Sequence, residues 1–258
     1  LNLVNNGSVN GWTDSKMPTI SGLRNRGFTP EILKDFILKC GISKANSVIN
    51  KSTLEESVRD ILSPISPRTM AILEPVELVI ENFEEHFGDN VEISIPNHPK
   101  DESMGHSISH LSKNIWVEKN DIRLTAEKDF WRIYPGNWVR LKHGYNILIK
   151  EVIANEFNEP IKVIAEIDVD SKNMKLAKHK AKVALHWLSS FDSVMIVSNF
   201  YNNLCDNDGN YLDDAMISKN ILINKNILEK ESHFEFERNG YFYFKDNTAH
   251  SLSLLKNR

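Results

Sequence analysis

Residues 129–145 hold the side chains whose types and spacing most clearly indicate a chemistry. Basic and aromatic side chains are interleaved there: Arg132, Arg140, Lys142 and His143 lie among Phe130, Trp131, Tyr134, Trp138 and Tyr145. Aromatic rings can stack on unpaired nucleobases, and the planar arginine fork can donate two hydrogen bonds to a base edge or a phosphate. This pattern predicts a surface for single-stranded nucleic acid, and a β-hairpin with a solvated basic edge is the alternative.

A second basic segment follows at residues 172–182 (KNMKLAKHKAK), with five lysines and no acidic residue. Ammonium groups in such a strip can contact nucleic-acid phosphates, which adds affinity without sequence preference. Lys175, Lys178 and Lys180 are the candidates for these weak backbone contacts. A solvated loop is the alternative interpretation.

The sequence contains no catalytic constellation: GxGxxG, P-loop and HEXXH patterns are absent. His106 and His110 could hold a metal ion from one helix face, but their Ser- and Gly-rich surroundings predict a loop. In residues 206–210 (DNDGN) the glycine is misplaced for a calcium loop, so a turn is predicted. Cys40 and Cys205 lack zinc-type spacing and form no disulfide framework.

Residues 11–27 (GWTDSKMPTISGLRNRG) form a distinctive string that helical or strand periodicity does not explain. Its larger apolar side chains are predicted to lie in the core of a helical unit; they are Trp12, Met17, Ile20 and Leu23. Arg24 and Arg26 have two open interpretations, contact with an RNA backbone or ion pairs within the protein.

Two helices can be placed by their end signals. Thr29 is a favourable N-cap with Pro30 at the first helical position, and Gly41 ends that helix. Its predicted apolar face consists of Ile32, Leu33, Phe36, Ile37 and Cys40. A second helix is predicted to open at Ser52, with Glu55 completing a capping box. Its apolar side consists of Leu54, Val58, Ile61 and Leu62.

From Thr69 onward the pattern changes to short β-branched runs, which predict strands. They cover residues 70–73, 76–80, 91–95, 138–141, 147–153 and 161–167. Residues 233–244 alternate around Asn239-Gly240, the signature of a type I′ hairpin. The predicted fold class is therefore mainly β with a small N-terminal helical subdomain, and the length of the β region indicates two barrels.

The composition limits the classes of protein to which the chain can belong. A formal charge of −4 means that any RNA contact must be local rather than a general basic field. The cysteine usage fits a reduced, cytoplasmic setting. The sequence has no apolar run long enough to span a membrane, and residues 1–11 are unlike a signal peptide. Because Leu1 enters directly into sequence of mid-protein character, the chain is interpreted as a fragment.

The opening string closely resembles the segment that follows the catalytic domain in glutaminyl-tRNA synthetases. Met17 favours the glutaminyl over the glutamyl branch of these enzymes, and Thr13 to Lys16 depart from the usual Asp-Asp-Pro-Arg. Further matches in order are Pro67-Arg68-x-Met70-Ala71, Pro96-Asn97-His98-Pro99, Val139-Arg140-Leu141-Lys142, His186-Trp187 and Phe236-Glu237-Arg238-x-Gly240-Tyr241-Phe242.

The resemblance implies a helical connector (1–67) followed by two nested anticodon-binding barrels. The proximal barrel would comprise residues 68–118 plus 190–258, and the distal barrel residues 119–189. It implies an enzyme that ligates glutamine to tRNA(Gln) with ATP and Mg²⁺, acting as a monomer with a catalytic domain that this fragment lacks. The fragment alone is expected to have no cofactor and no ligase activity. The alternatives are a glutamyl-tRNA synthetase and a non-catalytic RNA-binding barrel protein.

The resemblance also implies roles for single residues. Arg132 falls on the position that reads the third anticodon base, Arg68 on one that helps read the middle base, and Lys142 on one that contacts the first. Arg140 lies in the same motif as Lys142. Three positions depart from the family: Ser63 stands for an Asn, Trp131 for a Lys, and Glu235 for a Gln. An ionised Glu cannot donate as Gln does, which puts the middle-base contact of Glu235 in doubt.

Overall fold

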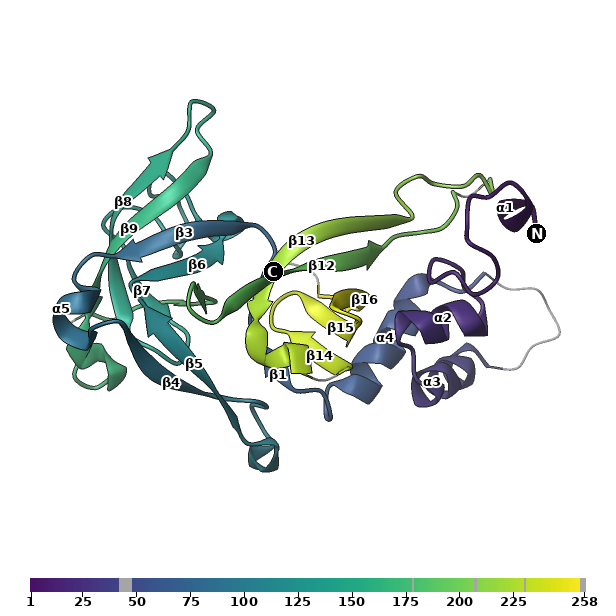
Figure 1. The fold of residues 1–258 in the computed structure, drawn as a ribbon, viewed down its shortest axis with the longest axis horizontal. Coiled ribbons are helices and arrows are strands. Elements are labelled where there is room, and N and C mark those ends of the chain that lie inside the picture. The colour runs from purple at the N-terminus through teal and green to yellow at the C-terminus, as the bar shows by residue number, and fades with distance from the viewer. Residues whose placement is uncertain (42–47, 178, 207, 230, 256–258) are drawn as a thin grey trace. The chain divides into compact units, whose positions relative to one another are not determined.

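The computed structural model describes residues 1–41, 48–177, 179–206, 208–229 and 231–255 (Figure 1). The chain divides into two compact units. Unit 1 comprises Leu1–Thr69, Ile196–Asn220 and Leu228–Arg258, and unit 2 comprises Met70–Met195 and Ile221–Ile227. Strands account for 39% of the structure and helices for 22%, so the fold is mainly β as predicted.

The helices of unit 1 are α1 (Asn2–Asn5), α2 (Ile20–Arg26), α3 (Pro30–Cys40) and α4 (Lys51–Leu62). Helix α3 has the predicted ends, since the Thr29 side chain accepts from the Ile32 N–H and Gly41 is the C-cap. The predicted start of α4 is wrong. Asn50 is its N-cap, because the Asn50 Oδ1 accepts from the Ser52 N–H at 2.9 Å, and the helix therefore includes Lys51 and Ser52.

The core of unit 1 forms where these helices pack on strands β15 (Gly240–Lys245) and β16 (Thr248–Leu254). Its buried residues are Phe28, Ile32, Val58, Leu62, Tyr241 and Leu252. Ile37 is 59% exposed, so the apolar face predicted for α3 is narrower than its sequence pattern. Trp12 and Ile20 were predicted to be core residues and are instead 51% and 76% exposed, whereas Met17 is buried and Leu23 packs against the core.

One seven-stranded sheet has the order β1-β14-β15-β16-β12-β13-β2 (Figure 1). Its strands are β1 (Arg68–Thr69), β2 (Ala71–Ile72), β12 (Ser193–Tyr201), β13 (Met216–Asn224), β14 (Ser232–Phe236), β15 (Gly240–Lys245) and β16 (Thr248–Leu254), and η4 (Lys225–Glu229) follows β13. The hairpin β14–β15 exists, but its turn is not the predicted Asn-Gly type I′. Phe236 pairs with Gly240, and residues 237–239 form the loop, with Arg238 at φ 68°.

The second seven-stranded sheet lies in unit 2 and has the order β10-β7-β8-β9-β3-β6-β11. Its strands are β3 (Pro75–Ile80), β6 (Asn114–Glu118), β7 (Trp138–Leu141), β8 (Asn146–Ala154), β9 (Pro160–Asp168), β10 (Ala184–Leu185) and β11 (Leu188–Ser189). The rest of unit 2 contains β4 (Asn90–Pro96), β5 (His106–Ser112), α5 (Phe83–Phe87), η1 (Glu102–Met104), η2 (Lys119–Asp121) and η3 (Val169–Lys172). Its core includes Leu78, Ile80, Ile115, Ile147 and Trp187, which are fully buried.

The two seven-stranded sheets form a nearly closed barrel and a half-barrel, which confirms the predicted fold class. The loop predicted around His106 and His110 is wrong. These residues lie on β5, because residues 106–112 pair in antiparallel register with residues 90–96 of β4. Among the described residues, no helix is both long and apolar enough for a membrane span.

Candidate nucleic-acid interface

Arg132 is held by a buried carboxylate in unit 2. Its Nη1 lies 2.9 Å from Asp121 Oδ1, and Asp121 is 1% exposed. The backbone fixes this pairing, because the Ile133 N–H donates to the Asp121 carbonyl at 2.9 Å. A buried carboxylate requires a charged or hydrogen-bonded partner. Arg132 therefore has a set orientation, and its side chain is still 31% exposed to a ligand.

Trp131, next to Arg132, is 42% exposed and carries a cation on its ring. The Lys182 ammonium nitrogen lies 3.1 Å from the ring centroid, which is a cation–π contact. The Asn137 amide donates to the carbonyl oxygens of Trp131 and Arg132, and thereby fixes the backbone of both. The Lys182–Trp131 contact joins the aromatic-basic segment to the lysine-rich segment.

Arg140 makes the second connection between these segments. Its Nη1 donates to the Ser171 carbonyl at 2.9 Å and to Asn146 Oδ1 at 3.1 Å, and its Nη2 donates to the Lys172 carbonyl at 3.3 Å. Burial lowers the pKa of Arg140 from its ordinary value. These contacts use the guanidinium for internal structure, which argues against Arg140 as a direct reader of a base.

Lys142 follows strand β7, beside the parallel strand β10. Its N–H donates to the Leu185 carbonyl at 3.0 Å, and its carbonyl accepts from the Trp187 indole N–H at 3.0 Å. The backbone of Lys142 is thus fixed by a fully buried tryptophan, and its side chain is half-buried. This geometry holds a cation at the end of the strand.

The structure therefore brings together, in unit 2, two segments that the sequence pattern presented as separate. Trp131, Arg132, Arg140 and Lys142 share this region with the lysine-rich segment, in which Lys175 and Lys180 are exposed. Lys178, also predicted to contact a backbone, lies outside the described residues. The pattern missed Asp121, since nothing in its local sequence marks it as the partner of Arg132.

In unit 1, Ser63, Arg68 and Glu235 converge on Tyr241. Arg68 Nε lies 2.9 Å from Glu235 Oε2, and the Tyr241 hydroxyl donates to the same oxygen at 3.1 Å. The pKa of Tyr241 is raised by burial, and a hydrogen bond with Ser63 opposes that shift. Glu235 therefore pairs with Arg68 as an ion-pair partner and accepts a hydrogen bond from Tyr241. Tyr241 was missed as a member of this group.

Arg24 and Arg26, in α2, have different surroundings. Arg26 is 8% exposed, its Nε donates to the Ser251 carbonyl at 2.8 Å, and its guanidinium lies 4.1 Å from the Tyr201 ring centroid. Burial lowers the pKa of Arg26 to about 10. This placement argues against a backbone contact by Arg26. Arg24 is exposed and lines an open pocket of about 500 Å³ with Tyr243 and Lys245.

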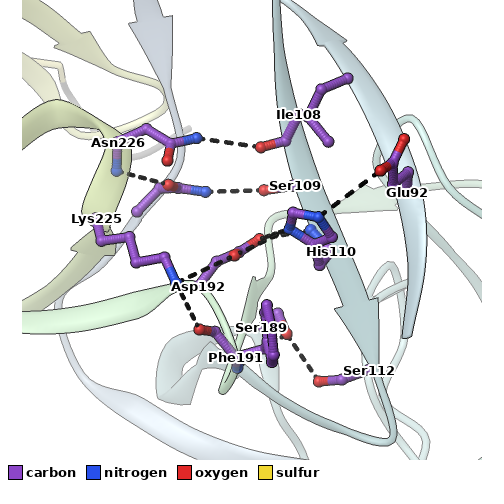
Figure 2. A network of polar contacts seen from close by, with 11 residues as sticks. Glu92, Ile108, Ser109, His110, Ser112, Ser189, Phe191, Asp192, Lys225 and Asn226 are labelled. Carbon is purple, nitrogen blue, oxygen red and sulfur yellow. Dashed lines mark hydrogen bonds and ion pairs between the residues drawn. The ribbon is translucent and has the colours of Figure 1, made fainter. Parts of the chain in front are cut away.

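His110 belongs to a structural network rather than to a metal site. Figure 2 shows its ring directed at Asp192, with Nδ1 3.1 Å from Asp192 Oδ1, while Lys225 approaches the same carboxylate at 3.9 Å. Asp192 is 2% exposed, so the His110 ring and the Lys225 ammonium provide polar partners for a buried carboxylate. No group of three or more potential metal ligands occurs in the described part of the chain.

The geometry is that of a β-barrel protein with an aromatic and basic surface, and residues 66–182 match a family model for a domain of this kind. The model describes the anti-codon binding domain of class I tRNA synthetases (E and Q). Residues 66–182 belong to this domain family, and this range contains Arg68, Trp131, Arg132, Arg140 and Lys142.

Curated relatives specify the branch of the family. A glutamine–tRNA ligase from Clostridium perfringens is 31% identical over 269 residues, which cover 99% of this chain and 48% of the relative. A glutamine–tRNA ligase from Cupriavidus metallidurans is 36% identical over 254 residues, which cover 93% of this chain and 43% of the relative. The predicted family is thus confirmed, and the chain spans about half the length of the curated relatives it matches.

Proposed function

We propose that this chain recognises the anticodon of tRNA(Gln) for a glutamine–tRNA ligase. The observation that carries the proposal is that the range matched to an anticodon-binding domain holds the aromatic-basic surface of unit 2. An anticodon is a single-stranded loop, and such loops are recognised by stacking and by hydrogen bonds to base edges. Trp131 supplies an exposed ring, and Arg132 supplies an oriented fork.

The proposal assigns different tasks to different residues. Arg132 and Arg68 are the base readers, because each has a guanidinium oriented by a carboxylate and a side chain that is partly exposed. Lys142, Lys175 and Lys180 contact the RNA as point charges, without a fork. Arg24 adds a weaker backbone contact from its pocket.

The whole enzyme in this proposal is a cytoplasmic, monomeric ligase that joins glutamine to its tRNA. Its ATP and Mg²⁺ bind to the part of the enzyme outside this chain. This chain alone is therefore not expected to aminoacylate tRNA. A glutamyl-tRNA synthetase is the runner-up, and the glutamine–tRNA ligases among the relatives favour the proposal over it.

The test is competition binding. A labelled tRNA(Gln) transcript is bound to the chain and displaced with transcripts that differ only in the anticodon. Because a bidentate base contact is worth about 1–3 kcal/mol, swapped anticodons should compete about 5- to 150-fold less well. Equal competition by all transcripts would leave only backbone attraction and refute the proposal.

Arg132→Ala tests the principal reader. It should weaken tRNA(Gln) binding and reduce the discrimination against a changed third base by about 5- to 150-fold. Lys150→Ala is the matched control, because Lys150 is an exposed cation in the same unit that pairs with Glu166. An equal loss for all transcripts would show that Arg132 touches only phosphate.

A further inference from the structure

Two rings in unit 2 form a stack that the sequence pattern did not indicate. The Trp138 and His179 rings lie with their centroids 4.5 Å apart and their planes at 16°. Trp138 is half-buried on β7, whereas His179 is exposed. Trp138 thus backs one face of the His179 ring.

The position of His179 is fixed by the barrel as well as by the stack. Its carbonyl accepts from the Asn146 Nδ2 at 2.8 Å. Asn146 is 3% exposed, and its own N–H donates to the Ser171 hydroxyl at 2.8 Å. An exposed ring with its backbone tied to a buried amide loses little conformational entropy when a ligand stacks on it.

Arg140 secures the beginning of the same segment. It donates to the carbonyls of Ser171 and Lys172 and to the Asn146 side chain, so it contacts both the segment and the residue that holds His179. Its fork makes these contacts in directions that a lysine ammonium cannot reproduce together. Arg140 therefore acts on His179 through Asn146 and the segment backbone.

The segment that carries His179 is rich in cations. Lys172 and Lys180 are exposed in this segment, and Lys182 lies over the Trp131 ring. A ring face beside ammonium groups fits a nucleotide, whose base stacks while its phosphate is neutralised. The same arrangement offers little to an apolar peptide, because the surrounding groups are charged.

We propose that the exposed face of His179, backed by Trp138, stacks on one unpaired base of the RNA loop, and that Arg140 is the positioning residue that holds it there. This inference rests on the proposed function and adds a stacking site to it. Stacking on an aromatic ring is tolerant of base identity, so the site contributes affinity rather than anticodon preference.

The experiment uses the full 258-residue chain and an anticodon stem-loop RNA with 2-aminopurine at successive loop positions. At one position the wild-type chain should change the fluorescence, and His179→Ala should remove that change and weaken binding about 5- to 150-fold. His179→Phe keeps a ring and should bind within about twofold of wild type. Lys150→Ala, the control for charge, should leave the fluorescence change in place.

A double-mutant cycle tests Arg140. Arg140→Lys keeps the charge but loses the fork, and it should weaken binding in the wild-type background while adding little in the His179→Ala background. Additive losses would show that Arg140 does not act through His179. An unchanged affinity and fluorescence response in His179→Ala would overturn the stacking site.

The outcomes separate this inference from the proposed function. Anticodon discrimination by wild type together with a silent His179→Ala refutes the inference alone. Loss of affinity in His179→Ala for an RNA that is bound without anticodon preference supports the stacking site and refutes the anticodon reader. Absence of RNA binding by the wild-type chain refutes both.

Discussion

Gly27 is the position at which a single added carbon should disturb unit 1 most directly. It is the C-cap of α2 with φ 108°, and the Tyr243 side chain packs straight onto it. A Cβ at Gly27 would lie 2.3 Å from Tyr243 Cβ and 2.4 Å from Tyr243 Cγ. Neither atom is the flexible end of a side chain, so the contact can be relieved only by moving β15 or α2.

Gly27→Ala should therefore destabilise unit 1 through two effects. The left-handed backbone costs about 1–2 kcal/mol for a residue with a Cβ. Displacing a packed side chain costs about 1–3 kcal/mol more, for a combined loss of about 2–5 kcal/mol. The assay is urea unfolding followed by far-ultraviolet circular dichroism, because α1 to α4 all belong to unit 1.

Gly11→Ala is the matched control. Gly11 has φ 96°, lies in the same unit and would have nothing within 4 Å of an added Cβ, so only the backbone effect of about 1–2 kcal/mol applies. The smaller entropy of the unfolded chain is common to both variants and cancels in the comparison. Adding Tyr243→Ala should not rescue Gly27→Ala, because the closest atom, Tyr243 Cβ, remains. Equal unfolding midpoints for Gly27→Ala and Gly11→Ala would refute the reasoning.

Two further predictions concern buried charge. Burial lowers the pKa of both His233 and His250 below 6.5, so these side chains take up protons more readily in the unfolded chain than in the folded one. Unit 1 should therefore lose stability as the pH falls below about 6.5. Urea midpoints from circular dichroism between about pH 7.5 and 5 check this, and a midpoint that does not fall would contradict it. Asp121→Asn keeps the shape of the side chain but removes the charge that orients Arg132. Because solvent screens the partly exposed Arg132, the loss of the ion pair should lower the free energy of unfolding of unit 2 by about 1 kcal/mol. The same substitution should reduce third-base discrimination. Tryptophan fluorescence follows that unfolding, and unchanged discrimination would show that Asp121 does not orient the reader.

The local elements could be predicted because their signals lie within a few residues. The strand runs and the Thr29 cap were found in this way, since periodicity and capping depend on neighbours in the chain. The start of α4 was missed because both Asn50 and Ser52 are favourable caps, and only the backbone geometry decides between them. The β14–β15 turn was displaced because Gly240 is needed inside the strand, where a Cβ would lie 2.2 Å from the Ser253 carbonyl oxygen.

The amino-acid composition of the segments indicated which residues could form the candidate site, but not which residues contact one another. Arg140 and the Ser171 carbonyl that it binds are 31 positions apart, and the strand register brings them together. The Arg68–Glu235 pair likewise depends on the parallel pairing of β1 with β14. Pairings of this kind are not encoded in a local pattern. The resemblance to a family suggested positions for base readers, which remain a prediction, whereas the contacts of Asp121 with Arg132 and of His179 with Trp138 became visible only in the fold.

The ion pairs explain how a chain with a net charge of −4 can be suited to an anionic ligand. Arg132 and Arg68 each face a buried carboxylate, which cancels much of their charge while fixing the direction of the guanidinium. Such an arginine offers oriented donors rather than general attraction, and oriented donors are what distinguish one base edge from another. General attraction falls instead to the lysine-rich segment, which has no acidic residue to offset it. In the proposed function, separating the two tasks gives selectivity without a strongly basic surface, because the proposed base readers are not the residues proposed to contact the RNA backbone.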